Sequence, residues 1–173
     1  MVISKAARDE YESVRFFYHS MTDALEGTKY HPKWQKDIYP AQEDLQDAID
    51  KGELYIGRVG ERIAAAMVLN QQYNPEYEDI VWTMPLDRSE FMVIHMLGVH
   101  SDFAGRGLAK EMVRFAIETA RAAGMKAIRL DVLKGNTAAE RLYTGMGFRY
   151  LHTLKMFYED TGWTDFELYE YVL

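Results

Sequence analysis

A glycine-bearing turn between an apolar segment and a helical pattern carries the clearest chemistry in this sequence. Residues 97–110 read Leu-Gly-Val-His-Ser-Asp-Phe-Ala-Gly-Arg-Gly-Leu-Ala-Lys, so we expect a buried strand to run through this turn into a long helix. The first turn of a helix leaves backbone N–H groups without partners, and the helix dipole adds partial positive charge there. The small residues of the turn are Gly105, Gly107 and Ala109, and the nearby cations are Arg106, Lys110 and Arg114. The pattern indicates a phosphate or pyrophosphate site. The alternative is a plain turn that uses glycine for a positive φ.

Two common phosphate-binding motifs do not fit this turn. A Walker loop would continue with Gly-Lys-Ser/Thr, which does not follow here. A dinucleotide fingerprint would place a third glycine where this sequence has Lys110. The turn therefore belongs to a different class of anion site.

A second segment narrows that class. After the strand pattern Ile-Arg-Leu-Asp-Val at 128–132 comes Asn-Thr-Ala-Ala-Glu-Arg-Leu-Tyr-Thr-Gly-Met-Gly-Phe at 136–148. Together with the glycine turn, it resembles the GNAT superfamily of acyl-CoA-dependent N-acyltransferases. Members of that superfamily share a turn close to Arg/Gln-x-x-Gly-x-Gly/Ala and a later Asn-x-x-Ala-x-x-Leu-Tyr-x-x-x-Gly-Phe. The second motif matches at Asn136, Ala139, Leu142, Tyr143, Gly147 and Phe148.

The first motif matches less completely. Gly107 and Ala109 agree with it, but Ala104 stands where Arg or Gln is usual. That departure removes one polar contact and leaves the backbone of the turn intact. The resemblance covers about residues 91–150, and the paired motifs at this separation are specific.

The resemblance implies acetyl-CoA as the acyl donor, and it implies how this chain would hold it. Leu97 and Val99 would pair through their backbone with the pantetheine arm, and the side chain of Asn136 would contact the same arm. The pyrophosphate would lie on the turn, whose residues are Ala104, Gly105, Arg106, Gly107, Leu108, Ala109 and Lys110.

Tyr143 would lie beside the thioester sulfur. A phenol with a pKa near 10 is protonated at neutral pH, so Tyr143 can donate a proton to the departing thiolate. The other interpretation is a core aromatic, because Ala139, Leu142 and Met146 share its neighbourhood on a helix.

The base that takes the proton of the amine is open between three candidates. His95 lies on the central strand, on the same face as Leu97 if that strand is unbroken, and an imidazole titrates near neutrality. It can equally be a buried histidine held by a backbone or tyrosine partner. Glu90, at the start of the strand, is the second candidate, and water is the third. His100 points to the opposite face from His95 on an unbroken strand, which makes a metal pair unfavourable.

The sequence has no cysteine and no Gly-x-Ser-x-Gly elbow, so a covalent acyl-enzyme has little support. We expect direct attack of a primary amine, on a small molecule or a peptide, in a ternary complex without a metal. Two alternatives stand beside this function. One is a non-catalytic acyl-CoA-binding sensor or interaction domain, and the other is a protein or peptide N-acetyltransferase.

Two loops are candidates for the acceptor side. Residues 73–90 hold five acids with Tyr73, Tyr77 and Trp82, which favours a cationic amine if the loop lines the pocket. The blander interpretation is a solvated loop whose aromatics fill its own base. The 29–36 segment is basic and aromatic, and its charge points the opposite way, towards an acidic group or CoA.

The elements that must position these residues follow from periodicity. Strands are expected at 1–5, 54–59, 63–71, 91–99, 127–133, 149–158 and 163–172, and helices at 8–25, after Pro40, from 107 to 124 and from 136 to 146. The order predicts an α/β (α+β) fold: a mixed, mostly antiparallel sheet of six to seven strands flanked by about four helices.

Length and composition agree with one domain over residues 1–173. The chain has 173 residues, 48% hydrophobic, and a net charge of -7, which argues against a nucleic-acid partner. No apolar run approaches a membrane span, and the lack of cysteine fits a cytoplasmic location. The resemblance also suggests a homodimer, with Tyr158, Tyr169 and Tyr171 as contact residues.

Overall fold

The computed structural model describes residues 1–28 and 33–173. Its strands are β1 (Val2–Lys5), β2 (Leu54–Val59), β3 (Arg62–Asn70), β4 (Phe91–Val99), β5 (Ala127–Leu133), β6 (Arg149–Tyr158) and β7 (Gly162–Val172). Its α-helices are α1 (Tyr11–Leu25), α2 (Gln42–Asp50), α3 (Leu108–Ala122) and α4 (Thr137–Gly145). Short 3-10 helices lie at Arg8–Glu10, Pro75–Asp79, Arg88–Glu90 and Ser101–Phe103. The expected elements are present, and most boundaries agree within one residue.

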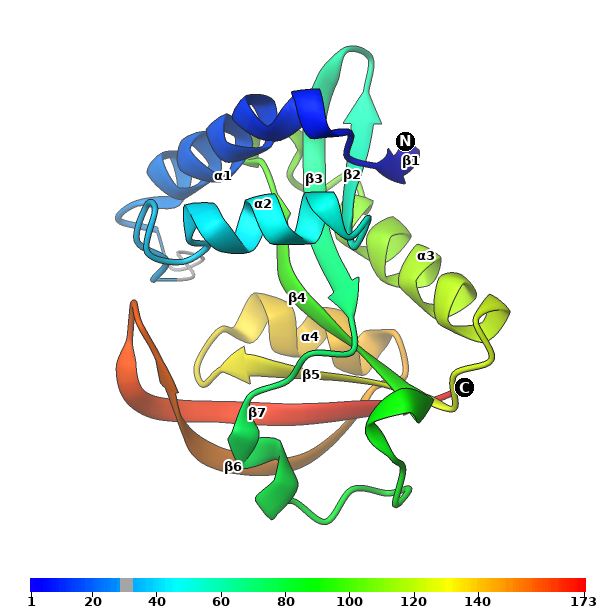
Figure 1. Cartoon of the computed structure of the whole chain (residues 1–173). Coiled ribbons are helices and arrows are strands. Elements are labelled where there is room, and N and C mark those ends of the chain that lie inside the picture. Colours follow the sequence, from blue (N-terminus) through cyan, green and yellow to red (C-terminus); the bar gives the residue numbers. More distant parts are fainter. Residues whose placement is uncertain (29–32) are drawn as a thin grey trace.

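The strands form one seven-stranded sheet in the order β1-β2-β3-β4-β5-β7-β6. Every neighbouring pair is antiparallel except β4 and β5, which are parallel. That pair is registered only from Phe91–Ala127 to Val93–Arg129, and the two strands then separate (Figure 1). The second half of β4 therefore has no β5 partner within the described residues, which leaves one edge of its backbone open to a ligand.

The two faces of the sheet are covered by different helices, because alternate residues of β3 point to opposite sides. Ala65 and Met67 pack with α3 and with residues of α4. Ala66 and Val68 pack with α1 and α2. Figure 1 shows the same layers, with α1 and α2 on one side of the β2–β4 strands and α3 on the other.

The local sequence explains where the two site-bearing helices begin. Gly107 precedes α3 with φ of 78°, a left-handed conformation that glycine adopts without steric cost. Asn136 precedes α4 and its side-chain oxygen accepts a hydrogen bond from the Ala139 N–H at 3.2 Å. Helix α3 follows β4 and helix α4 follows β5, so both helices begin near the opening between these two strands.

One expectation about β4 is wrong. A β-bulge places both Met96 and Leu97 opposite Met67, and Met96 has φ of 55°. His95 pairs with Val68 on the α2 face, whereas Leu97 packs on the α3 face. The extra residue reverses the alternation, so His95 and Leu97 do not share a face.

Candidate active site

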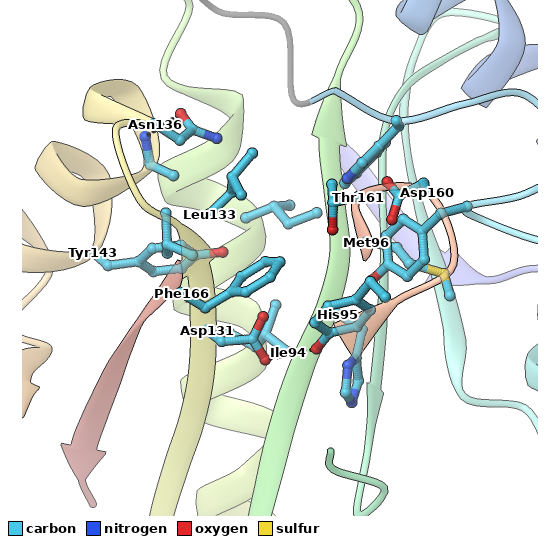
Figure 2. Close-up of a pocket in the computed structure, with 16 residues that line it drawn as sticks. Ile94, His95, Met96, Asp131, Leu133, Asn136, Tyr143, Asp160, Thr161 and Phe166 are labelled. Atoms are coloured by element: carbon cyan, nitrogen blue, oxygen red, sulfur yellow. Dashed lines mark hydrogen bonds between the residues drawn. The ribbon is translucent and has the colours of Figure 1, made fainter. Parts of the chain in front are cut away.

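A cavity of about 120 Å³ lies where β4 and β5 separate, and we call it the central cavity (Figure 2). It is lined by Trp34, Tyr39, Ile94, His95, Met96, Leu97, Asp131, Val132, Leu133, Asn136, Ala139, Tyr143, Tyr158, Asp160, Thr161 and Phe166. These residues come from both separating strands, from α4, from the turn between β6 and β7, and from the segment after α1. The splayed strands thus create a shared space that distant parts of the chain complete.

Tyr143 extends from α4 into this cavity. Its side chain is 6% exposed, and its ring packs edge-on to Phe148 with centroids 5.4 Å apart. Figure 2 shows the hydroxyl pointing towards the middle of the cavity, and no hydrogen bond to it is present in the part of the chain that the structure describes. Burial raises the pKa of Tyr143, and the nearby Asp131 acts in the same direction. The phenol is therefore protonated at neutral pH and faces a space that a ligand can occupy.

A second cavity, of about 220 Å³, continues from Tyr143 towards the start of α3, and we call it the donor groove. It is lined by Met21, Leu25, Trp34, Leu97, Gly98, Val99, Ala109, Asn136, Ala138, Ala139, Leu142 and Tyr143. The sequence motifs assigned Leu97, Val99, Ala109, Asn136 and Tyr143 to one site, and the structure brings these five residues together.

The turn before α3 presents consecutive backbone donors. The first helical bond runs from the Glu111 N–H to the Gly107 carbonyl, and the N–H groups of residues 105–110 have no acceptor within the described residues. A Cβ built on Gly105 or Gly107 would meet no atom within 4 Å, so the space over the turn is open. The Ala104 N–H, in contrast, donates to the Ser101 carbonyl at 2.9 Å. The Ala104 N–H is thus not available to an anion, and the prediction that Ala104 contributes to the pyrophosphate site is wrong.

The bulge in β4 is held from the α1 side. The Tyr18 hydroxyl donates to the Met96 carbonyl at 2.9 Å, and this tyrosine is 2% exposed. The left-handed Met96 is thereby fixed three residues beyond Val93, the last residue of β4 that pairs with β5. The adjacent His95 lines the central cavity and also a larger cavity on the α2 side.

His95 is held by a backbone partner, as one of the two interpretations expected. Its Nε2–H donates to the Gln72 carbonyl at 3.0 Å, which leaves Nδ1 as the acceptor nitrogen. Burial lowers the pKa of His95, so the ring is neutral at pH 7. In Figure 2 the ring turns away from Tyr143 and Asp131.

The structure does not bring Glu90 into the site. Glu90 forms an ion pair with Lys126 and accepts the Asp87 N–H at 2.9 Å, at the end of β4 where the two strands are still paired. The Lys126 hydrogen bond lowers the pKa of Glu90, which makes the carboxylate a weaker base. The hypothesis that Glu90 takes the proton of the amine is therefore wrong on position.

Asp131 is the functional candidate that the sequence motifs missed. It lies on β5 in the wall of the central cavity, and its Oδ2 accepts the Tyr77 hydroxyl at 2.7 Å and the Tyr158 hydroxyl at 3.0 Å. Oδ1 has no hydrogen-bond partner among the described residues. Burial raises the pKa of Asp131, while the two tyrosine hydrogen bonds oppose that rise. A lone acid within the apolar pattern Ile-Arg-Leu-Asp-Val was the available signal.

The larger cavity on the α2 side measures about 690 Å³, and we call it the acidic cavity. Its acids are Asp37, Glu43, Asp44, Asp47, Glu53 and Glu159, and its aromatics are Tyr39, Tyr73, Phe157 and Tyr158. Lysine and arginine do not contribute to its described lining. Tyr39, His95, Met96 and Tyr158 line this cavity and the central cavity, so the two spaces adjoin.

Similarity to known proteins identifies the family of this chain. The model of the Acetyltransferase (GNAT) family matches residues 16–148. The chain belongs to the GNAT acetyltransferase family. The uncharacterized N-acetyltransferase YesJ of Bacillus subtilis is 26% identical over 108 residues, which cover 62% of this chain and 59% of YesJ. The chain spans less than two thirds of the curated relatives that it matches.

Solved structures show the same GNAT fold. A GNAT-family acetyltransferase from Streptococcus agalactiae superposes with a TM-score of 0.82 at 19% identity, covering 99% of this chain and 95% of that one. The structure of yncA from Salmonella typhimurium, solved with its cofactor acetyl-CoA, has a TM-score of 0.70 at 16% identity and covers 100% and 94%. The expected fold class is therefore confirmed.

Within this GNAT domain, the acidic wall expected from residues 73–90 comes from other segments. Tyr73 lines the acidic cavity, but the acids come from α2, from Glu53 and from the ends of two loops. Tyr77 is buried in the core, and the Trp82 indole donates to its carbonyl at 2.9 Å. These two aromatics fill the base of their own loop, which was the blander of the two interpretations.

The basic segment 29–36 is only partly within the described structure, since residues 29–32 lie outside it. Lys33 and Lys36 line a separate cavity beside α1, and Lys36 pairs with Asp23. Trp34, between them, lines both the central cavity and the donor groove. The segment thus contributes an aromatic side chain to the site.

Three further expectations concern a metal pair, a membrane span and a dimer contact. With the bulge, His95 and His100 no longer follow simple alternation, and His100 Nδ1 accepts the Asp102 N–H at 3.2 Å. No group of three or more potential metal ligands occurs among the described residues, and none of their helices is long and apolar enough to cross a membrane. Tyr158 and Tyr169 point inward, to Asp131 and to Tyr143 and Tyr150, so they are poorly placed as dimer contacts.

Proposed function

We propose that this GNAT domain transfers an acetyl group from acetyl-CoA to a primary amine by direct attack in a ternary complex. The observation that carries the proposal is the hydroxyl of the largely buried Tyr143, which has no hydrogen-bond partner among the described residues and lies where the donor groove and the central cavity meet.

The residues present fit acetyl-CoA. The N–H groups of residues 105–110 offer donors for a pyrophosphate at a helix start, and Arg106, Lys110 and Arg114 form no ion pair within the described chain. Beyond Val93 the β5 side of β4 is open for backbone pairing with an extended arm. The Asn136 side chain lines the groove, where its Nδ2 is available while Oδ1 caps α4. When bound, acetyl-CoA supplies the activated thioester.

The neutral amine nitrogen forms a C–N bond with the thioester carbonyl carbon, and the C–S bond breaks. Tyr143 donates its proton to the departing thiolate, and backbone N–H groups of β4 beyond the bulge stabilise the oxyanion. The proton released by the amine passes to a base in the central cavity.

Asp131 and His95 are the two groups placed to receive that proton. Asp131 lines the same cavity as Tyr143, its Oδ1 has no hydrogen-bond partner among the described residues, and its raised pKa makes it a better proton acceptor than an ordinary aspartate. His95 Nδ1 is the second candidate, at the boundary with the acidic cavity. We assign the role to Asp131, because the His95 ring turns away from Tyr143 (Figure 2).

The pH dependence of the rate separates the two bases. We expect Asp131→Asn to remove the acid limb of the kcat profile and His95→Gln to leave it in place. A limb that moves to higher pH in His95→Gln and persists in Asp131→Asn would assign the base to His95.

Two other functions make different predictions. A non-catalytic sensor would bind CoA without turnover on any amine, which the unpartnered Tyr143 hydroxyl disfavours. A protein or peptide N-acetyltransferase would need an open groove. Here the Gln35 side chain donates to the Asp160 carbonyl at 2.7 Å, and Tyr39 contacts Tyr158 with ring centroids 5.6 Å apart. These contacts join the segment after α1 to the end of β6 and the β6–β7 turn beside the central cavity, which favours a small molecule.

The test is thiol release from acetyl-CoA over a panel of polyamines, aminoglycosides, amino acids and N-terminal peptides. Calorimetry with CoA measures donor binding separately. Turnover on at least one amine supports the proposal. Tight CoA binding with no turnover on any acceptor would establish the sensor instead.

A further inference from the structure

The acidic cavity adjoins the reacting centre and has a charge that selects an acceptor. The N–H groups before α3 and the donor groove account for the acyl donor, so the acceptor must reach Tyr143 from another direction. The acidic cavity provides that direction, because it shares His95, Met96, Tyr39 and Tyr158 with the central cavity. The Tyr143 side chain is 6% exposed, and its hydroxyl, which has no hydrogen-bond partner among the described residues, faces the central cavity from the α4 side.

Only part of the negative charge in the acidic cavity is neutralised inside the protein. Asp37 is neutralised, since it accepts two hydrogen bonds from Arg15 at 2.9 and 2.6 Å. Asp47 pairs with Lys51 at 2.5 Å. The remaining acids have no cationic partner within the described residues, and they are Glu43, Asp44, Glu53 and Glu159.

Glu53 is the most informative of these carboxylates. It is partly buried, and its Oε2 accepts a hydrogen bond from Asn70, a neutral side chain that is 8% exposed. The negative charges of Glu53 and Asp44 both act to raise the pKa of His95, against the larger effect of burial. Their carboxylates therefore lie near the boundary between the two cavities. A partly desolvated carboxylate without a cation is unfavourable unless a ligand supplies the charge.

The other walls of the acidic cavity suit an aliphatic cation. Tyr39, Tyr73, Phe157 and Tyr158 present aromatic surface, against which a methylene chain packs and an ammonium group is attracted. The asparagines and glutamine of the lining add carbonyl acceptors and no charge. An acceptor with a carboxylate next to its amine would meet repulsion here.

We infer that the acceptor is a small aliphatic diamine or polyamine, whose reacting amine enters the central cavity while a second ammonium group lies in the acidic cavity. The inference rests on the proposed transfer to an amine and adds the class of substrate. The first amine must reach Tyr143 in its neutral form, whereas the second stays charged and is held by Glu53 and its neighbours. The second charge therefore contributes to binding and not to the chemical step.

The experiment compares acceptors with and without a second charge, and 1,4-diaminobutane and 4-amino-1-butanol form the pair of equal length. Thiol release is measured with 1,4-diaminobutane, spermidine, 1-aminobutane and 4-amino-1-butanol, and with a lysine-containing peptide as the macromolecular arm. We expect kcat/KM for the diamines to exceed that for the monoamines by at least about tenfold, mainly through KM. Raising the salt from about 0.02 to about 0.5 M should reduce this preference, because screening weakens charge attraction.

The variant Glu53→Gln keeps the shape and the Asn70 hydrogen bond while it removes the charge. We expect it to raise KM for the diamine by about three- to tenfold and to leave KM for 1-aminobutane unchanged. Glu118→Gln is the matched control, since Glu118 is exposed on α3 across the sheet. If Glu53→Gln folds poorly, the salt dependence of the wild-type preference gives the same information.

The outcomes separate this inference from the function on which it rests. Equal kcat/KM for diamines and monoamines would overturn the diamine class and leave the acetyltransferase in place. Faster reaction with the peptide than with any diamine would assign a basic peptide as the acceptor and overturn the inference. Acetyl-CoA binding without thiol release on any amine would overturn the transferase itself.

Discussion

The Tyr143→Phe substitution tests the reaction chemistry because it removes one atom and no packing. The ring keeps its contacts with Phe148 and Tyr169, whose centroids lie 5.4 and 6.5 Å away. The hydroxyl has no hydrogen-bond partner among the described residues, so its loss leaves no protein group unsatisfied. We expect the free energy of unfolding to stay within about 1 kcal/mol of wild type, with any change towards greater stability.

The effect on catalysis should be far larger than the effect on stability. A positioned general acid contributes about 10²- to 10⁴-fold, which corresponds to about 2.7 to 5.4 kcal/mol in the activation free energy. We expect kcat to fall within that range. The Kd of acetyl-CoA should change by less than about threefold, because we propose that residues 105–110 and β4, and not the Tyr143 hydroxyl, hold the pyrophosphate and the arm.

The assay is thiol release at saturating acetyl-CoA, with calorimetric binding of CoA and urea unfolding of the same samples. Tyr55→Phe is the control: Tyr55 is 8% exposed in the core next to α3 and does not line the central cavity. A kcat within threefold of wild type would refute Tyr143 as the acid. A parallel loss of stability above 1 kcal/mol would show that the hydroxyl has a structural role instead.

Three further substitutions probe the rest of the site. Asp131→Asn should raise Tm at pH 8. The pKa of Asp131 is raised in the folded protein, so the stability that its protonated form contributes is lost as pH rises through that pKa. The difference in Tm between the variant and wild type should therefore vanish on acidification. Gly107→Ala should raise KM for acetyl-CoA about tenfold and lower the free energy of unfolding by about 1 to 2 kcal/mol, because φ at Gly107 is 78°. Gly124→Ala is the control, because Gly124 lies beyond α3 with φ of 73°; it carries the same strain and should leave KM unchanged. Arg129→Met should cost about 3 to 5 kcal/mol in urea unfolding, since it strands the buried Glu170 that Arg129 contacts at 3.1 Å; a cost below 1 kcal/mol would contradict that account.

Local patterns in the sequence were enough to predict the helices and strands and the residues that line the donor groove. The strand, glycine turn and helix around Gly107, and the capped helix that begins after Asn136, are set by short-range chemistry. Residues that line one groove, from Leu97 to Tyr143, could therefore be named before any tertiary contact was known. What the periodicity of β4 could not show was the extra residue at Met96, which turns His95 to the other face.

The acceptor side was decided by tertiary structure alone. Asp131 became a candidate only because Tyr77 and Tyr158, far from it in sequence, hold one carboxylate oxygen at the cavity wall. The acidic cavity gathers carboxylates from α2, from the start of β2 and from the β6–β7 turn, and single-segment charge counts cannot reveal that sum. Backbone hydrogen bonding near a glycine is local, whereas the charge of a cavity depends on which distant segments the sheet brings together.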